Sequence, residues 1–157
     1  MNPEQVLREV AEQTMEALAY LLPMSEDDVE LTGETSAAAV TFSGPFNGGL
    51  IMRVSTGMLD ELAANMLGAG GEELTESQRF DGFKELLNVV CGNLLPRLAG
   101  DKAVFNVGAP LLLSGDEAPE SLAGLDKHCQ ISMELDSGEA ALELYLDAAA
   151  RSEIGAC

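Results

Sequence analysis

The chain opens with apolar residues at helical spacing, which predict a first helix over 3–22. Asn2 is suited to cap this helix and Pro23 is expected to end it. The buried stripe is expected to contain Leu7, Ala11, Met15, Leu18 and Leu22.

Two more helices are predicted in the middle of the chain. The first covers 58–67 and stops at the glycine-rich stretch 68–71. The second begins after Thr75, which has capping-box spacing to Gln78, and continues to Pro96. Because proline lacks an N–H and clashes with the preceding turn, Pro96 is expected to end or kink this helix.

Elsewhere the pattern changes to alternation, which is typical of strands. Val29 and Leu31 predict a short edge strand in an acidic stretch. Longer alternating runs predict strands over 37–44, 47–55, 103–114 (broken at Pro110), 128–136 and 139–147. The last two would form a hairpin around Asp136, Ser137 and Gly138. Residues 148–157 are small and polar and are expected to fray.

This order of elements predicts the fold class. Helices and strands are grouped rather than strictly alternating, which favours an α+β domain with helices packed on one face of a mainly antiparallel sheet. No linker or repeat divides the chain, so we expect a single domain over 1–157.

The third helix carries two different faces. Its apolar stripe, which should face the core, is Phe83, Leu86, Leu87, Val90 and Leu94. Asp81, Glu85 and Asn88 share another face, and Gly92 continues that row one turn later. A glycine inside a helix costs about 1 kcal/mol relative to alanine, which suggests that another group must come close there. Chance alone produces Glu-x-x-Asn pairs in a chain this acidic, so the pair by itself indicates only a solvated face.

Charge excludes several classes of partner. The chain has 8 basic and 27 acidic residues and a formal net charge of −19. Nucleic acids and anionic membranes require basic surface, so we expect neither as a partner. The N-terminal residues lack a signal-peptide pattern and no apolar run is long enough to cross a membrane, which predicts a cytoplasmic protein.

The sequence offers no metal or nucleophile constellation. His128 and Cys129 lack a second ligand pair at a usable spacing, so we expect no metal site. The single histidine argues against a Cys–His or Ser–His–Asp site, and Cys91 is interpreted as a buried core thiol.

The segment DGFKELLN over 81–88 resembles the motif of the CheC/CheX/FliY family, phosphatases of chemotaxis-type response regulators. That motif is Asp or Ser, three residues, Glu, two residues, Asn, here Asp81, Glu85 and Asn88. Pro110 lies 22 positions beyond Asn88, close to where the family carries a proline. The stretch 42–68 is similar to the family's hairpin feeding a helix, and a single motif in a short domain is similar to the CheX branch.

The resemblance implies a CheC-like fold and a phosphatase acting on an aspartyl phosphate of a CheY-like response regulator. Asn88 would position the attacking water and Glu85 would pair with the partner's lysine. Asp81, Lys84 and Gly92 are expected to contact the partner. The chain would need no cofactor of its own, because Mg²⁺ would come from the response regulator.

Two other interpretations stay open. The chain could be a non-catalytic module that binds a response regulator or belongs to a flagellar switch, or a structural domain whose polar helix face is incidental. The resemblance also implies a homodimer. Most of the surface is expected to be acidic, and we call this the acidic coat. Half of the basic residues lie in 77–114, so the proposed site falls in a segment where acidic charge is balanced, a gap in that coat.

Overall fold

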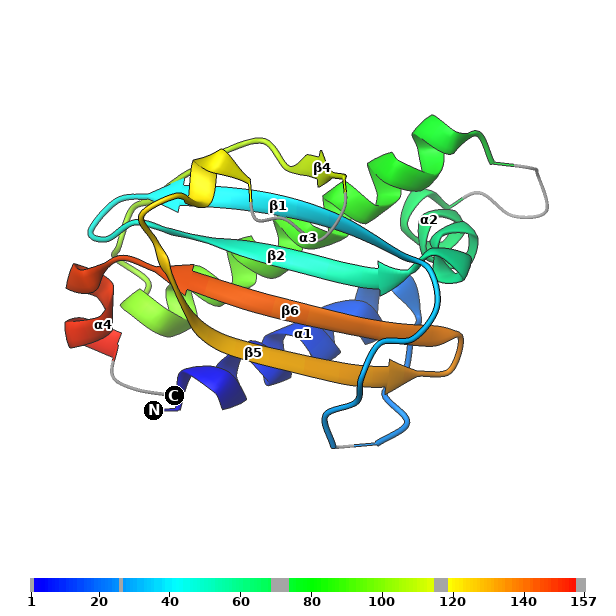
Figure 1. Ribbon diagram of the computed structural model, residues 1–157, viewed down its shortest axis with the longest axis horizontal. Coiled ribbons are helices and arrows are strands. Elements are labelled where there is room, and N and C mark those ends of the chain that lie inside the picture. Colours follow the sequence, from blue (N-terminus) through cyan, green and yellow to red (C-terminus); the bar gives the residue numbers. More distant parts are fainter. Residues whose placement is uncertain (1, 26, 69–73, 115–118, 155–157) are drawn as a thin grey trace.

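The computed structural model describes residues 2–25, 27–68, 74–114 and 119–154 (Figure 1). In these residues six antiparallel strands form one sheet, in the order β3-β1-β2-β6-β5, with β4 also paired to β1. The strands are β1 (Thr35–Ser43), β2 (Gly48–Ser55), β3 (Asn106–Val107), β4 (Leu111–Leu113), β5 (Asp126–Leu135) and β6 (Gly138–Leu146). The predicted hairpin at 136–138 is confirmed as the β5–β6 connection.

Helices cover one face of this sheet (Figure 1). They are α1 (Pro3–Ala19), α2 (Leu59–Leu67, after the short 3-10 turn η1, Thr56–Met58) and α3 (Glu76–Ala99), with α4 (Ala148–Ile154) at one end. The core lies between helices and sheet, and Leu7, Phe83 and Leu142 are fully buried in it. The predicted α+β fold, with helices on one face of an antiparallel sheet, is confirmed.

The helix starts follow their predicted caps, but the end of α1 does not lie at Pro23. The Asn2 side chain accepts the N–H of Glu4, and Thr75 and Gln78 form the reciprocal capping box of α3. α1 ends at Ala19 because Tyr20 adopts a left-handed conformation, with φ 53°, and its N–H bonds back to the Met15 carbonyl. The chain turns there, so Leu21 is buried and Leu22, expected in the core, is 47% exposed.

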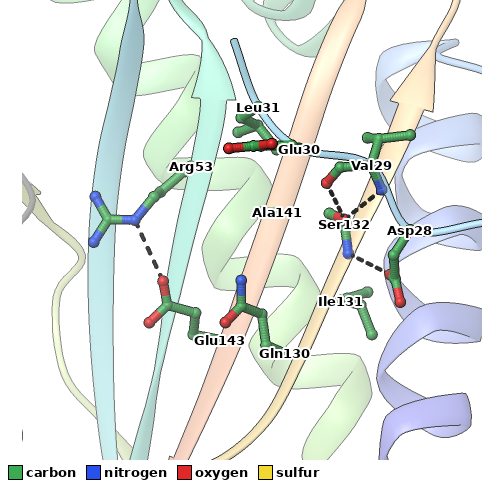
Figure 2. Close-up of a pocket in the computed structure, with 10 residues that line it drawn as sticks. All are labelled: Asp28, Val29, Glu30, Leu31, Arg53, Gln130, Ile131, Ser132, Ala141 and Glu143. Atoms are coloured by element: carbon green, nitrogen blue, oxygen red, sulfur yellow. Dashed lines mark hydrogen bonds and ion pairs between the residues drawn. The ribbon is translucent and has the colours of Figure 1, made fainter.

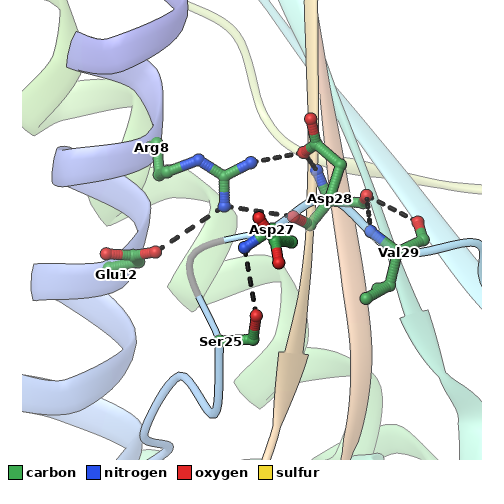
Figure 3. A network of polar contacts seen from close by, with 7 residues as sticks. Arg8, Glu12, Ser25, Asp27, Asp28 and Val29 are labelled. Carbon is green, nitrogen blue, oxygen red and sulfur yellow. Dashed lines mark hydrogen bonds and ion pairs between the residues drawn. The ribbon is translucent and has the colours of Figure 1, made fainter.

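The expected edge strand at Val29 and Leu31 is absent. The segment runs beside β5, but side chains hold it in place instead of a backbone ladder. The Val29 N–H donates to Ser132 Oγ at 2.8 Å, and the Ser132 N–H donates to Asp28 Oδ1 at 2.9 Å. Arg8 of α1 pairs with Asp28 and, at 3.7 Å, with Glu12 (Figure 3). The acidic segment is therefore fixed to the helix layer by one arginine.

Pro96 does not end α3, which continues for three more residues to Ala99. Pro96 faces solvent, whereas its neighbours Leu94, Leu95 and Leu98 are buried. Their packing against the core outweighs the hydrogen bond that proline cannot make.

The expectation of a frayed tail after 147 is wrong for residues 148–154, which form α4. Asp147 Oδ1 accepts the Ala150 N–H at 2.9 Å, and Arg151 pairs with Asp126 at the start of β5 at 2.9 Å. Ala150 and Ile154 are buried in the core. Residues 155–157 lie outside the described residues.

None of the helices in the described parts of the chain combines the length and the apolar character required to span a lipid bilayer.

Candidate functional site

The two faces of α3 are arranged as its sequence pattern indicates. Phe83, Leu86, Leu87 and Val90 are completely buried against the sheet and the other helices. Asp81, Glu85, Asn88 and Gly92 are exposed and lie along the opposite side. Because helical residues three and four apart are neighbours, Glu85 and Asn88 present a carboxylate and an amide one turn apart.

α3 is held rigidly beneath this exposed row. Gly82 packs against α2 so closely that a Cβ there would lie 2.7 Å from the Ala63 Cα. On the α1 side, Asn93 Nδ2 donates to Thr14 Oγ1 at 3.4 Å, and Arg97 pairs with Glu9 at 2.8 Å. A site on such a braced helix is presented in a fixed geometry, as positioning catalysis requires.

The exposed row borders a groove of about 320 Å³ between α3 and the connection from β3 to β4. It is lined by Asp81, Lys84, Glu85, Asn88, Ala109 and Pro110. The structure thus brings Pro110 beside Asn88, although 22 residues separate them in sequence. Ala109 carried no signal in the sequence, because its place in the groove depends on how β4 pairs with β1.

Glu85 and Asn88 are available to an external group. Within the described residues, neither side chain makes a hydrogen bond or an ion pair. Lys84, by contrast, lies 3.7 Å from Asp81, in a loose pair whose partners are 35% and 59% exposed. The groove therefore offers, beside a cation, one amide and one carboxylate to which no other described residue is bound.

α2 carries a similar pair of residues, of which Asn65 has a structural contact. Glu61 and Asn65 are spaced one residue too far apart for the same geometry, and Asn65 Nδ2 donates to the Ala19 carbonyl at 2.6 Å. That bond satisfies an orphan carbonyl at the end of α1 and ties α1 to α2.

A second hollow, of about 580 Å³, lies on the sheet face away from the helices (Figure 2). Glu143 on its floor is 8% exposed and is bound by Arg53 at 3.4 Å, Lys127 at 3.3 Å and the Tyr145 hydroxyl at 2.6 Å. Burial alone would raise the pKa of Glu143, but these three neighbours together hold that pKa below its ordinary value. The Glu143 carboxylate and the groups that bind it satisfy one another, which is typical of a structural network.

The part of the chain that the structure describes assembles no nucleophile or metal site from the other candidates. Cys91 is fully buried, as expected, and burial raises the pKa of its thiol to about 12. Such a thiol is not a nucleophile at neutral pH. In the described residues no three His, Cys, Asp or Glu side chains gather as metal ligands. Of the glycines at 68–71, Gly68 ends α2 with φ 68°, and the others lie outside the described residues.

Known proteins share this fold. The family model of the chemotaxis phosphatase CheX matches residues 36–134, which is more than half of the chain. A sequence comparison with curated proteins finds no match.

Solved structures agree with the family match. CheX of Vibrio vulnificus is 18% identical, with a TM-score of 0.71 over 94% of this chain and 97% of the other. The CheX of a CheX–CheY–BeF₃–Mg²⁺ complex from Borrelia burgdorferi is 11% identical, with a TM-score of 0.58 over 91% and 96%. Thermotoga maritima FliY is 13% identical, with a TM-score of 0.58 over 97% and 93%. With an α3 motif on a sheet of this topology and a family match over 99 residues, the chain belongs to the chemotaxis phosphatase CheX family.

Proposed function

We propose that this protein hydrolyses the aspartyl phosphate of a CheY-type response regulator. The observation that carries the proposal is the pair Glu85 and Asn88, which lie one turn apart and exposed on the braced helix α3. Neither side chain is bound by another of the described residues. The similar Borrelia burgdorferi structure, in which CheX is bound to CheY with Mg²⁺, supports this class of partner.

Asn88 would hold the attacking water in line with the phosphoryl group. An amide suits this role because it donates and accepts hydrogen bonds without changing charge. An acyl phosphate already has a good leaving group, so positioning and charge stabilisation are sufficient for catalysis.

Glu85 would pair with a lysine of the response regulator and so orient the two proteins. Asp81 and Lys84 border the groove and would contact the partner at its edge. Gly92 would let the partner approach the α3 backbone, because in the described residues nothing beyond the neighbouring backbone of α3 lies within 4 Å of the place where its Cβ would be. Mg²⁺ would be bound by the response regulator.

A second candidate is a non-catalytic module of the same fold that binds a response regulator or a flagellar-switch protein. The similarity to the structure of Thermotoga maritima FliY supports this candidate. In this case Glu85 and Asn88 would contribute to docking alone.

The deciding experiment follows the decay of a CheY-type response regulator phosphorylated with acetyl phosphate. We expect the wild type to accelerate decay and Asn88→Ala to lose about 10²-fold of that acceleration, because a preorganised polar group in an active site contributes on this order. Glu85→Ala should weaken binding as well as slow decay.

Matched controls are available on the same helix. Asn93→Ala removes an asparagine that faces Thr14 instead of the groove, and Glu76→Ala removes an exposed glutamate in the first turn. Glu76→Ala should retain the wild-type rate, and Asn93→Ala, which loses one contact between α3 and α1, should slow decay far less than Asn88→Ala does. A wild type that binds without accelerating decay would establish the module, and wild-type rates in Asn88→Ala would exclude the phosphatase mechanism.

A further inference from the structure

The groove beside the proposed site contains a lysine whose charge is only loosely held. The Lys84 ammonium lies 3.7 Å from the Asp81 carboxylate, which is beyond hydrogen-bond distance. It makes no hydrogen bond to any of the described residues, and its side chain is partly exposed. The three N–H donors of this ammonium are therefore available to a group that enters the groove.

The two arginines of the same helix are held more firmly. Arg79 pairs with Asp60 of α2 at 2.7 Å, and Arg97 pairs with Glu9 of α1 at 2.8 Å. Neither arginine is among the described residues that line the groove. Of the three basic residues of α3, Lys84 is thus the one that can change its partner at the site.

Lys84 lies one turn before Asn88. Because residues three and four apart are neighbours on a helix, Asn88 has Glu85 and Lys84 as its neighbours in the preceding turn. All three line the groove. A phosphoryl group beside the Asn88 amide would therefore be flanked by one carboxylate and one ammonium.

The facing wall of the groove carries no charge. Ala109 and Pro110 line it, and the segment 103–113 to which they belong contains no acidic or basic residue. An anion in the groove would thus meet charges from α3. Those of Asp81 and Glu85 repel it, and that of Lys84 attracts it.

Lys84 would act on contact and not from a distance. Far from the groove, the charges of Lys84 and Asp81 largely cancel, which agrees with a chain whose net charge is −19. The lysine stem is flexible, so the ammonium can turn from Asp81 toward a bound anion. Because an exposed ion pair contributes little to stability, this exchange of partners costs little.

We propose that Lys84 binds the phosphoryl oxygens of the response regulator and thereby makes binding depend on phosphorylation. The inference rests on the proposed function and deepens it. There Asn88 acts on the water and Glu85 on the regulator's lysine, whereas Lys84 acts on the phosphoryl group itself. Lysine side chains are a recurring means of binding phosphoryl oxygens and balancing their charge.

The test measures the affinity for two forms of one response regulator. One form is unmodified, and the other carries beryllofluoride and Mg²⁺, which imitate the aspartyl phosphate without being hydrolysed. Lys84→Met removes the charge and keeps the length of the side chain. It should bind the beryllofluoride form about 10-fold more weakly than the wild type does, the lower end of what a charge-assisted hydrogen bond contributes. Its affinity for the unmodified form should stay within about twofold of wild type, because that form offers Lys84 no phosphoryl group.

Two further variants control for charge. Lys84→Arg keeps the charge and should retain most of the preference for the beryllofluoride form. Lys102→Met removes the same charge from an exposed lysine that is not among the residues lining the groove, and it should leave the preference unchanged. An equal loss on both forms in Lys84→Met would overturn the inference, because Lys84 would then bind the regulator's surface and not the phosphoryl group. Wild-type affinities for both forms in Lys84→Met would overturn it too.

Failure of the proposed function has a different signature, because these affinities are measured on a form that is not hydrolysed. A wild type that prefers the beryllofluoride form but does not accelerate decay of the phosphorylated regulator would exclude the phosphatase. The comparison of Lys84→Met with Lys102→Met would still decide the role of Lys84. A wild type that binds both forms equally, or neither, would overturn the inference whatever its phosphatase activity.

Discussion

Gly82 and Gly92 lie on the same helix, and the structure gives a reason for only the first. A Cβ at Gly82 would collide with Ala63 of α2, so the helices require glycine there. A Cβ at Gly92 would meet nothing within 4 Å in the described residues apart from the neighbouring backbone of its own helix. Pro96 also cannot donate the usual hydrogen bond to the Gly92 carbonyl, four residues earlier. At Gly92, one turn beyond Asn88, the exposed backbone therefore has no side chain to cover it and a carbonyl without its usual helical donor.

Replacing each glycine by alanine should have opposite effects on stability. Gly92→Ala should raise the free energy of unfolding by about 1 kcal/mol, because alanine is the better helix former in an exposed interior position. Gly82→Ala should lower it, because the α2–α3 contact must open. Urea unfolding followed by circular dichroism measures both changes.

The same Gly92→Ala variant tests docking. If the response regulator approaches the α3 backbone, the more stable variant should nevertheless dephosphorylate it more slowly, through a higher KM. A stabilised variant with wild-type kinetics would show that no partner comes close at Gly92.

At the scale of single elements, the sheet face away from the helices makes a pH-dependent contribution to the stability of the fold. The pKa of Glu143 is held below its ordinary value in the folded protein, so the unfolded chain takes up a proton at higher pH than the folded one. Glu143 therefore stabilises the fold above its unfolded pKa, and this contribution is lost as pH falls through the lower folded value.

Glu143→Gln should remove this dependence. We expect a smaller loss of stability between neutral pH and the acid range than in wild type, measured as the free energy of unfolding at several pH values below about 5. Glu134→Gln, which removes an exposed carboxylate from the neighbouring β5, controls for the change in net charge. An acid dependence identical to wild type in Glu143→Gln would contradict the network around Glu143.

The elements that could be predicted are those whose signals are local. The capping box of α3, its apolar stripe and the β5–β6 turn each lie within a few residues of the element they define. α4 begins at a local cap, Asp147, but the short run after it shows no clear apolar stripe, and its further support is the distant Asp126 and a core made by other elements. The motif in Asp81, Glu85 and Asn88 was visible in sequence, whereas the place of Ala109 beside it required the pairing of β4 with β1.

At the scale of the whole molecule, the gap in the acidic coat is smaller than the sequence suggests. Of its four basic residues, Arg79 pairs with Asp60 at 2.7 Å, Lys84 with Asp81 at 3.7 Å and Arg97 with Glu9 at 2.8 Å. The region of the site is therefore close to neutral and not attractive to anions. The rest of the surface dominates the long-range field.

We expect added salt to accelerate the encounter with an acidic response regulator. Screening weakens the repulsion between two acidic surfaces, so kcat/KM should rise with ionic strength. Lys84→Glu extends the acidic coat across the groove and should steepen this rise. A kcat/KM that falls steadily with salt would mean that local attraction governs the encounter.

The sheet order places β6 between β2 and β5, although its residues 138–146 come after every other strand in the chain. During synthesis, α1, β1, β2, α2 and α3 all exist before β6 does. Until it arrives, β2 has an unpaired edge and the helices lack Leu142, Leu144 and Leu146 from the floor of the core. The domain must therefore complete its fold late. Between the synthesis of β2 and that of β6, the growing chain exposes an unpaired strand edge that can pair with other chains, and a chaperone would be most useful in that interval.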